Sequence, residues 1–536
     1  MDTGSNQTGL SASDLSALCD PAAYPFDPGA RDGVELVQTH ISCVFLTRDL
    51  VYKFRKPVAL GFLDFTSRAE RTADCLRELN LNRRLTSDVY LGLAPLLRSA
   101  DGPRIGKLSE HETPDAEHCV VMRRLPHGRD ALSLLEAGRL EPVMLERLAR
   151  FVAAFHARTS LGTPAPWSLE EWRTRFARPA RDNVRVLRSL APELAPPPVV
   201  DRIEAAAERF LEERAADIER RRIDGRVVDG HGDLHLEHVW YLSSDAEPLA
   251  IDCIEFNDNL RKIDAAAEVA FLAMDLAYRG HADLGDLFLR SYADASGDYH
   301  LYTVVDYHIA YRACVRAKVA ALTASDPSVP PHQRERATGS ARRHLAFAAD
   351  ALARERRASL ILLCGVVGTG KSTVANVLSE VLEAPCISSD RIRERLLADV
   401  PRAERYTDAR RKLVYTELLR AAANILSSGR IVVLDATFET AAQRADATRV
   451  AREARADAWL VETTGEPSVV LQRLRSRAAA GLDPSDAGPE QYEASVARFE
   501  RPTEWHAERA FTLATDREDW RYAVEPIARR IRAGTR

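Results

Sequence analysis

The sequence predicts two folds in one chain: an α+β domain, followed by an α/β domain built on a parallel sheet. Its 536 residues exceed what one ordinary hydrophobic core accommodates, so two or more domains are expected. Strand-like and then mostly helical segments fill residues 33–352, whereas strands and helices alternate from residue 359 onward. We expect a disordered tail over 1–15, domains over 16–352 and 359–536, and a linker over 353–358.

The composition is typical of a soluble globular protein. Hydrophobic residues make up 46%, charged residues 29%, and the net charge is −5, so no general positive field would attract nucleic acid or a membrane. The 8 cysteines form no C-x-x-C pair, which argues against a zinc site or a disulfide framework. The polar start, MDTGSNQTGLSASD, is unlike a signal peptide, and no apolar run approaches the ~20 residues of a membrane span. We expect a cytoplasmic protein without a membrane partner; the sequence carries no signature of an oligomeric state.

The segment 359–373, SLILLCGVVGTGKST, carries the clearest chemical signal. An apolar strand runs into G-x-x-x-x-G-K-S, and the periodicity of an amphipathic helix follows. Glycines let the loop point its N–H groups at phosphate oxygens, Lys371 would reach the β- and γ-phosphates, and the Ser372 hydroxyl would bind Mg²⁺. The alternative is a glycine-rich turn with an incidental lysine. The expected nucleotide-binding residues are Gly365, Gly368, Thr369, Gly370, Lys371, Ser372 and Thr373.

Two later strands end in carboxylates that belong at the same edge of the sheet. Asp390 follows the second strand-like run and Asp435 the third. In a parallel sheet both lie beside the phosphate loop, where ligands bind. Asp390 would accept the proton of an attacking hydroxyl, Arg393 would hold an anionic group of the acceptor, and Asp435 would bind Mg²⁺ or its water. Ser389 or Asp390 could instead simply cap the following helix.

A basic helix and a turn-rich segment follow the fourth strand. The helix carries Arg473 and Arg477, and the segment at 481–488 reads GLDPSDAG. This arrangement suits a lid that closes over the phosphates, because cations neutralise the transferring group and the turns act as hinges. Alternating arginines are also typical of a solvent-exposed helix face, so both interpretations stay open.

The N-terminal half contains a second set of residues with kinase chemistry. A hairpin carries Lys53, a helix carries Glu78, an H-G-D loop contains Asp233, and a strand ends in Asp252. In this order the residues resemble an aminoglycoside-phosphotransferase-type, protein-kinase-like fold. The resemblance implies that Lys53 binds the α- and β-phosphates, with Glu78 (or, as a second choice, Glu70) as its helix partner. It implies catalysis by Asp233 and Mg²⁺ binding by Asp252. Beside Arg55 and Lys56, Lys53 could instead be one of three solvated charges.

Two departures from that family predict an impaired N-terminal site. His238 stands where these phosphotransferases have a Mg²⁺-binding asparagine, although Mg²⁺ prefers oxygen ligands. The hairpin segment 38–43, which would cover the phosphates, has no glycine to allow close approach. Asn257 could supply the missing amide. We therefore expect this half to bind ATP weakly and to serve in recognition or regulation.

The C-terminal half resembles small P-loop kinases that phosphorylate hydroxyls, such as polynucleotide 5′-kinases, zeta toxins, chloramphenicol phosphotransferase and gluconate-type kinases. The matching pieces are GVVGTGKST, SSD-x-I-R and LDAT. The order of the halves resembles bacterial fusions of an aminoglycoside phosphotransferase-like domain with a P-loop kinase. The resemblance implies an enzyme that uses ATP and Mg²⁺ to phosphorylate a hydroxyl of a small molecule.

Two alternatives to that function stay open. One is a bifunctional double kinase. The other is a kinase acting on a nucleotide-sugar or a nucleic-acid end, with the N-terminal half as a pseudokinase module. A nucleic-acid acceptor is less favoured, because aromatic residues make up only 7% and no basic groove is evident.

Overall fold

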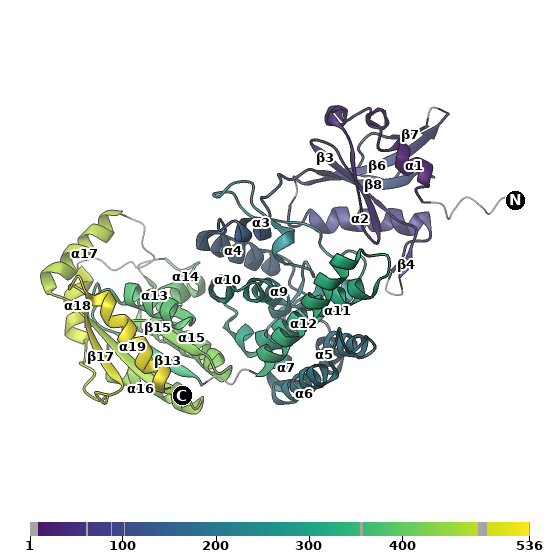
Figure 1. The fold of residues 1–536 in the computed structure, drawn as a ribbon. Coiled ribbons are helices and arrows are strands. Elements are labelled where there is room, and N and C mark those ends of the chain that lie inside the picture. Colours follow the sequence, from purple (N-terminus) through teal and green to yellow (C-terminus); the bar gives the residue numbers. More distant parts are fainter. Residues whose placement is uncertain are drawn as a thin grey trace. The chain divides into compact units, whose positions relative to one another are not determined.

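The computed structural model describes residues 9–60, 63–86, 88–100, 102–353, 357–401, 404–480 and 490–534. The chain separates into two compact units, each made of segments that are distant in sequence (Figure 1). The first unit comprises Met1–Pro166 and Val227–Asp275, and the second comprises Trp167–Arg226 and Leu276–Arg536.

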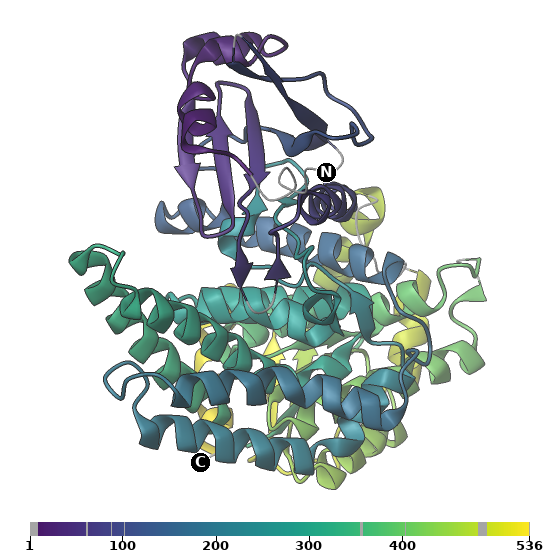
Figure 2. The same ribbon diagram turned by 90° about the vertical axis from the view of Figure 1, so that its right-hand side faces the viewer.

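The first unit is built on a six-stranded antiparallel sheet in the order β1-β2-β3-β8-β6-β7. Its strands are β1 (Glu35–Gln38), β2 (Ser42–Leu46), β3 (Leu50–Arg55), β6 (Tyr90–Ser99), β7 (Gly102–Ile105) and β8 (Glu117–Arg123). The predicted hairpin is present as β2 and β3, and Val44 pairs with Lys53. Helix α2 (Arg68–Asn82) covers one face of the sheet, where its buried Cys75 and Leu79 pack among the strand residues (Figures 1 and 2).

Further helices and strands complete the first unit. These are α1 (Ala12–Ala17), β4 (Ala59–Leu60), β5 (Leu63–Asp64), α3 (Ala131–Glu136), α4 (Pro142–Arg158), β9 (Val227–Asp229), β10 (Val239–Trp240), β11 (Leu249–Ala250), α8 (Asp258–Arg261), β12 (Lys262–Asp264) and most of α9 (Ala265–Tyr278). Helix α1 begins within the tail predicted to be disordered (1–15), so the end of that tail is helical. A capping box explains it: the Ser11 hydroxyl accepts from the Asp14 N–H, and the Asp14 carboxylate accepts from the Ser11 N–H.

The C-terminal part of the second unit is the predicted α/β fold. Five parallel strands lie in the order β14-β15-β13-β16-β17. They are β13 (Ser359–Cys364), β14 (Cys386–Ser388), β15 (Ile431–Asp435), β16 (Asp457–Thr464) and β17 (Ala510–Ala514). Because β13 is the central strand, with β15 on one side and β16 on the other, its carboxyl end lies at the point where the strand order reverses. Ligands of open α/β sheets bind at this point.

Helices surround that sheet. They are α13 (Lys371–Leu382), α14 (Ser389–Leu396), α15 (Asp408–Ser427), α16 (Ala441–Glu453), α17 (Pro467–Ala480), α18 (Glu490–Arg498) and α19 (Trp520–Gly534). Helices α13 and α19 share one buried apolar cluster with the sheet, which joins Leu378 and Ile527 to Ile361 and Val461. Strand β13 is buried along its whole length, as expected for a central parallel strand.

The remainder of the second unit is helical. Its helices are α5 (Leu169–Arg188), α6 (Pro197–Glu213), α7 (Ala215–Ile223), α10 (Ala282–Ser296), α11 (Val305–Ser325) and α12 (Pro331–Ala353). Helices α5 and α6 run side by side (Figure 2). The prolines at 196–198 form the N-cap and the first residues of α6. Among the described residues, no helix combines the length and apolar character needed to cross a membrane.

Candidate functional site

The loop between β13 and α13 has a backbone that glycine makes accessible. Gly365, Gly368 and Gly370 have φ angles of 141°, 83° and 83°. A Cβ atom at Gly365 would lie 2.5 Å from the carbonyl oxygen of Thr463, so a larger residue cannot be accommodated there. Helix α13 begins directly after this loop, with Gly370 as its N-cap. Its first N–H groups and its dipole favour a bound phosphate at this position.

The residues predicted to bind phosphate and Mg²⁺, Lys371, Ser372 and Asp435, lie close together near the first turn of α13. The Lys371 ammonium donates to the carbonyls of Gly365 (3.0 Å) and Val366 (2.9 Å). Burial lowers the pKa of Lys371, against the opposing effect of Asp435 and Asp390. Burial also raises the pKa of Asp435, while its hydrogen bond with Ser372 acts in the opposite direction. A hydroxyl and a carboxylate are oxygen donors that fit Mg²⁺, as predicted for Ser372 and Asp435.

One cavity of about 540 Å³ joins the phosphate loop to the residues after β14 and β15. Gly368, Gly370, Lys371, Ser372 and Thr373 line one side of it. The opposite lining comes from other elements and consists of Ser389, Asp390, Arg393, Tyr406, Arg411, Tyr415, Asp435, Ala436, Thr437, Glu439, Gln443, Gln491 and Arg498, with Val367 completing the wall. The cavity thus brings five of the seven expected nucleotide-binding residues together with both predicted carboxylates, while Gly365 and Thr369 do not line it.

Asp390 reaches the cavity from the first turn of α14. The N-cap of this helix is Ser388, whose hydroxyl accepts from the Asp390 N–H at 3.3 Å, so neither Ser389 nor Asp390 is the cap. The Asp390 carboxylate accepts from the Arg393 guanidinium, which also lies 4.5 Å from the centre of the Tyr406 ring. This carboxylate is 30% exposed, whereas the Arg393 side chain is 9% exposed. Asp390 is therefore accessible to a ligand, and Arg393 is fixed beside it.

Arg473 is held away from the cavity lining. Its guanidinium donates to the Thr515 hydroxyl (3.0 Å) and carbonyl (2.8 Å), and that hydroxyl donates to the Thr369 carbonyl at 2.8 Å. In this structure Arg473 therefore braces the phosphate loop through the end of β17. The side chain of Arg477 and the predicted lid segment 481–488 lie outside the described residues.

Several cavity residues were not predicted from the sequence. The Tyr415 hydroxyl lies 3.1 Å from the Thr437 hydroxyl and accepts from the Phe438 N–H at 3.1 Å. The Glu439 carboxylate accepts from the Ser495 hydroxyl (2.9 Å) and from the Arg498 guanidinium (3.0 Å). Neither Tyr415 nor Glu439 belongs to a recognisable sequence motif, and only tertiary packing brings them to the cavity.

The kinase-type residues of the first unit also converge. The Lys53 ammonium lies 2.8 Å from a Glu78 oxygen and 2.8 Å from Asp252 Oδ1. Burial alone would lower the pKa of Lys53, but Asp252 and Glu78 outweigh it and raise this pKa well above its ordinary value. Lys53 lowers the pKa of Asp252. Glu78 rather than Glu70 is thus the helix partner, and Lys53 is not a solvated charge.

Arg55 extends this ionic network into the interior. Its guanidinium is 1% exposed and binds Asp74 (2.6 Å), Glu78 (2.7 Å) and Glu255. Burial raises the pKa of Glu255 to about 8. A buried arginine that binds three carboxylates fixes α2 and the segment after Asp252 against β3, so the network holds Lys53 and its partners in place.

The H-G-D loop is held by Glu268, whose carboxylate accepts the N–H groups of His231 and Gly232 (2.9 Å for the latter). Behind it, His238 Nδ1 lies 2.8 Å from the Asp233 carbonyl, and His238 Nε2 lies 3.7 Å from Asp252 Oδ2. The imidazole thus stands where the resemblance puts an amide oxygen. The Asn257 side chain is used as the N-cap of α8, since its oxygen accepts from the Asn259 N–H at 2.9 Å. These donors do not fit a typical Mg²⁺ site.

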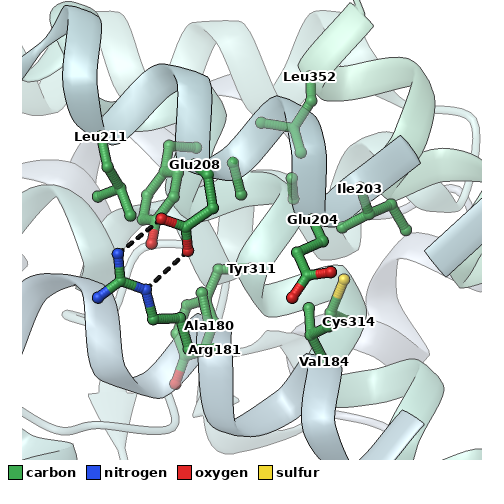
Figure 3. Close-up of a pocket in the computed structure, with 13 residues that line it drawn as sticks. Ala180, Arg181, Val184, Ile203, Glu204, Glu208, Leu211, Tyr311, Cys314 and Leu352 are labelled. Carbon is green, nitrogen blue, oxygen red and sulfur yellow. Dashed lines mark hydrogen bonds and ion pairs between the residues drawn. The ribbon is translucent and has the colours of Figure 1, made fainter. Parts of the chain in front are cut away.

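A second cavity, among α5, α6, α11 and α12, is not suited to a ligand. It measures about 20 Å³, and its lining is mostly apolar, with Val184, Leu211 and Cys314 among the side chains (Figure 3). Arg181 and Glu208 form an ion pair at 2.6 Å on its wall (Figure 3). This volume is about that of one water molecule, so the cavity is a packing defect between helices.

Comparison with known proteins assigns a different family to each part of the chain. The phosphotransferase enzyme family (APH) matches residues 50–307, and an AAA domain family matches residues 360–502. Uncharacterized proteins of Mycobacterium tuberculosis (strain H37Rv) and Mycobacterium bovis are 33% identical over 493 residues, which is 90% of this chain and 93% of each of theirs. The chain belongs to their family. In this chain, an N-terminal phosphotransferase domain is fused to a C-terminal P-loop kinase domain.

Solved structures resemble the two parts separately. An amicoumacin kinase, solved with AMP-PNP, Ca²⁺ and Ami, is 15% identical, with a TM-score of 0.37 over 63% of this chain and 96% of its own. The APS kinase of Mycobacterium tuberculosis, solved with AMPPNP and APS, is 23% identical, with a TM-score of 0.26 over 33% of this chain and 99% of its own. From its two matching families the chain is an ATP-dependent kinase with two kinase-type domains, and a P-loop kinase uses ATP and Mg²⁺.

Proposed function

We propose that residues 359–536 transfer the γ-phosphoryl group of ATP to a hydroxyl group of a small-molecule acceptor. The observation that carries this proposal is the single cavity of about 540 Å³ that contains both halves of such a site. Lys371 and Ser372 line it on the donor side, while Asp390 and Arg393 line it on the acceptor side. A cavity of this size suits a phosphate chain and a small acceptor.

In the proposed reaction, an oxygen of the acceptor hydroxyl attacks the γ-phosphorus in line with the bond to the β–γ bridging oxygen. The new O–P bond forms as the bridging bond breaks, ADP leaves, and the hydroxyl proton passes to the Asp390 carboxylate. Lys371 and the loop N–H groups hold the β- and γ-phosphates. Ser372 and Asp435 would hold Mg²⁺, which supplies positive charge to the phosphate oxygens.

The acceptor side of the cavity favours a small molecule that bears an anionic group. Arg393 and Arg411 both line it, together with Tyr406 and Tyr415. Arg411 is oriented by the Tyr406 carbonyl, which accepts its Nε–H at 2.9 Å. A guanidinium that is positioned by its neighbours binds a carboxylate or phosphate with little loss of entropy. We therefore propose an acceptor that carries a carboxylate or phosphate besides the reacting hydroxyl.

We further propose that the N-terminal kinase-like half, over residues 16–352, serves in substrate recognition or regulation. The substitution of an imidazole for an amide at His238 is the main support for this proposal. The assembled Lys53–Glu78–Asp252 group supports a second candidate function, a bifunctional double kinase.

The test is a screen of radiolabelled ATP, with label in the γ position, against sugars, aminoglycosides, nucleosides, phosphorylated or carboxylated forms of each, and RNA 5′ ends. Thin-layer chromatography separates the labelled products. We expect label on a small hydroxyl compound with an anionic group. Label on RNA 5′ ends alone would contradict the proposed acceptor class, and release of inorganic phosphate with every acceptor would contradict transfer itself.

A further inference from the structure

The catalytic loop of the first unit gathers two imidazoles and two carboxylates. One ligand atom from each of Asp233, His235 and His238 lies within 4.8 Å of the others. Asp252 joins this group through His238, because its Oδ2 lies 3.7 Å from His238 Nε2. The rings of His235 and His238 are close, with centroids 3.9 Å apart. Two nitrogen donors and one oxygen donor thus lie together, and an Asp252 oxygen lies beside one of them, His238.

The spacing of these atoms suits a metal ion better than direct hydrogen bonds. His235 Nε2 lies 3.6 Å from Asp233 Oδ2, and His238 Nε2 lies 3.7 Å from Asp252 Oδ2. Both separations exceed a normal hydrogen bond. A tetrahedral ion with bonds of about 2.0–2.2 Å holds its ligand atoms about 3.3–3.6 Å apart. Asp233, His235 and His238 are thus spaced as ligands of one ion, and a movement of the Asp252 carboxylate toward them would supply the fourth ligand.

Neighbouring groups orient both imidazoles as ligands. His238 Nδ1 lies 2.8 Å from the Asp233 carbonyl, and since a carbonyl can only accept, Nδ1 carries the proton and Nε2 keeps its lone pair. His235 Nδ1 faces the Glu237 carboxylate at 3.6 Å, which leaves Nε2 on the side of Asp233. Metal-binding histidines are usually oriented in this way by a carbonyl or a carboxylate on the other nitrogen.

Lys53 binds only one of the two carboxylate oxygens of Asp252. It binds Asp252 through Oδ1, so Oδ2 remains directed toward His238. The side chains of Asp233 and Asp252 are 36% and 46% exposed, whereas that of His235 is 5% exposed. The carboxylates can thus be reached from solvent, while the His235 imidazole is fixed within the protein.

We propose that Asp233, His235, His238 and Asp252 bind a divalent transition-metal ion of the Zn²⁺ type in preference to Mg²⁺. Imidazole nitrogen favours such ions, whereas Mg²⁺ requires oxygen ligands in near-octahedral geometry. His238 determines this preference, because an asparagine at this position would replace one of the two nitrogen ligands by an amide oxygen.

The test uses the full chain without an affinity tag and without nucleotide. Zn²⁺ and Mg²⁺ binding are measured by isothermal titration calorimetry, and Co²⁺ serves as a spectroscopic substitute whose visible absorption reports nitrogen ligands. We expect Zn²⁺ to bind at one site. His238→Asn should weaken Zn²⁺ affinity by at least about 10- to 100-fold, because substitution of a residue that merely orients a metal ligand already has an effect of this size. The Co²⁺ spectrum should change in the same variant.

Two control variants locate the ion. His111→Asn removes an exposed histidine outside the group and should leave Zn²⁺ affinity unchanged. Asp435→Asn alters the site at the P-loop and should also leave it unchanged. Equal Zn²⁺ affinity in the wild type and in His238→Asn would overturn the proposal. So would loss of binding in Asp435→Asn alone, or a wild-type affinity for Mg²⁺ that matches that for Zn²⁺. Circular dichroism of His238→Asn shows whether the variant is folded.

Discussion

Replacing Asp390 by asparagine separates its proposed chemical role from its structural one. A base that accepts the hydroxyl proton, the role proposed for Asp390, would contribute a factor of about 10²–10⁴ to the rate, or about 2.7–5.5 kcal/mol of the barrier. Its structural contribution is smaller. The carboxylate lies in the first turn of α14 and accepts from Arg393, but Ser388 caps the helix. A partly exposed pair and a favourable helix dipole together give at most about 2 kcal/mol.

We therefore expect Asp390→Asn to stay folded, to bind a fluorescent ATP analogue as the wild type does, and to transfer phosphate about 10²–10⁴ times more slowly. Single-turnover transfer from labelled ATP measures the chemical step, and thermal unfolding measures stability. Ser388→Ala is the matched control: it removes the cap, which costs about 1 kcal/mol, and should leave the rate nearly unchanged. An Asp390→Asn enzyme with a wild-type rate per folded molecule would refute the assignment of the base.

Three further predictions concern the second unit. Lys371→Ala should abolish ATP turnover, because it removes the cation of the β- and γ-phosphates; substantial residual turnover would exclude the P-loop as the site. Arg221→Met should lower the free energy of unfolding by about 3–5 kcal/mol in a denaturant titration, because it leaves buried Asp298 without the guanidinium 2.8 Å away; a loss below 1 kcal/mol would argue against that pair. Burial and the nearby Arg221 lower the pKa of His308 well below 6.5. As the pH falls below 6.5, the unfolded chain therefore binds a proton at His308 while the folded protein does not, and the free energy of unfolding decreases. His308→Phe should therefore gain stability relative to the wild type between about pH 8 and pH 5.5, and an unchanged difference would contradict this.

The sequence predicted those parts of the site that depend on strand ends and loops. In a parallel sheet the residue after a strand has a known position, which is why Asp390 and Asp435 could be assigned to the edge beside the phosphate loop. The pairing of Lys53 with Glu78 followed from the resemblance to a known fold, and the structure contains it at 2.8 Å.

Long-range packing explains what could not be predicted. Tyr415 and Gln443 reach the cavity from helices with no motif, and their positions depend on how α15 and α16 pack. From the sequence, Arg473 suits either a mobile lid or a solvent-exposed helix face. In the structure its guanidinium instead donates to Thr515, which follows β17 and is distant in sequence. The predicted disordered tail was wrong at its end, because Ser11 and Asp14 form a capping box that starts α1.

The most direct test compares phosphate transfer by two single variants of the full chain. Lys371→Ala disables the proposed catalytic site, and Asp233→Ala disables the kinase-like loop of the first unit. With labelled ATP and the best acceptor from the screen, our account predicts that Lys371→Ala yields no labelled product, whereas Asp233→Ala retains transfer. Transfer that survives in Lys371→Ala and disappears in Asp233→Ala would contradict the account and assign catalysis to the N-terminal half.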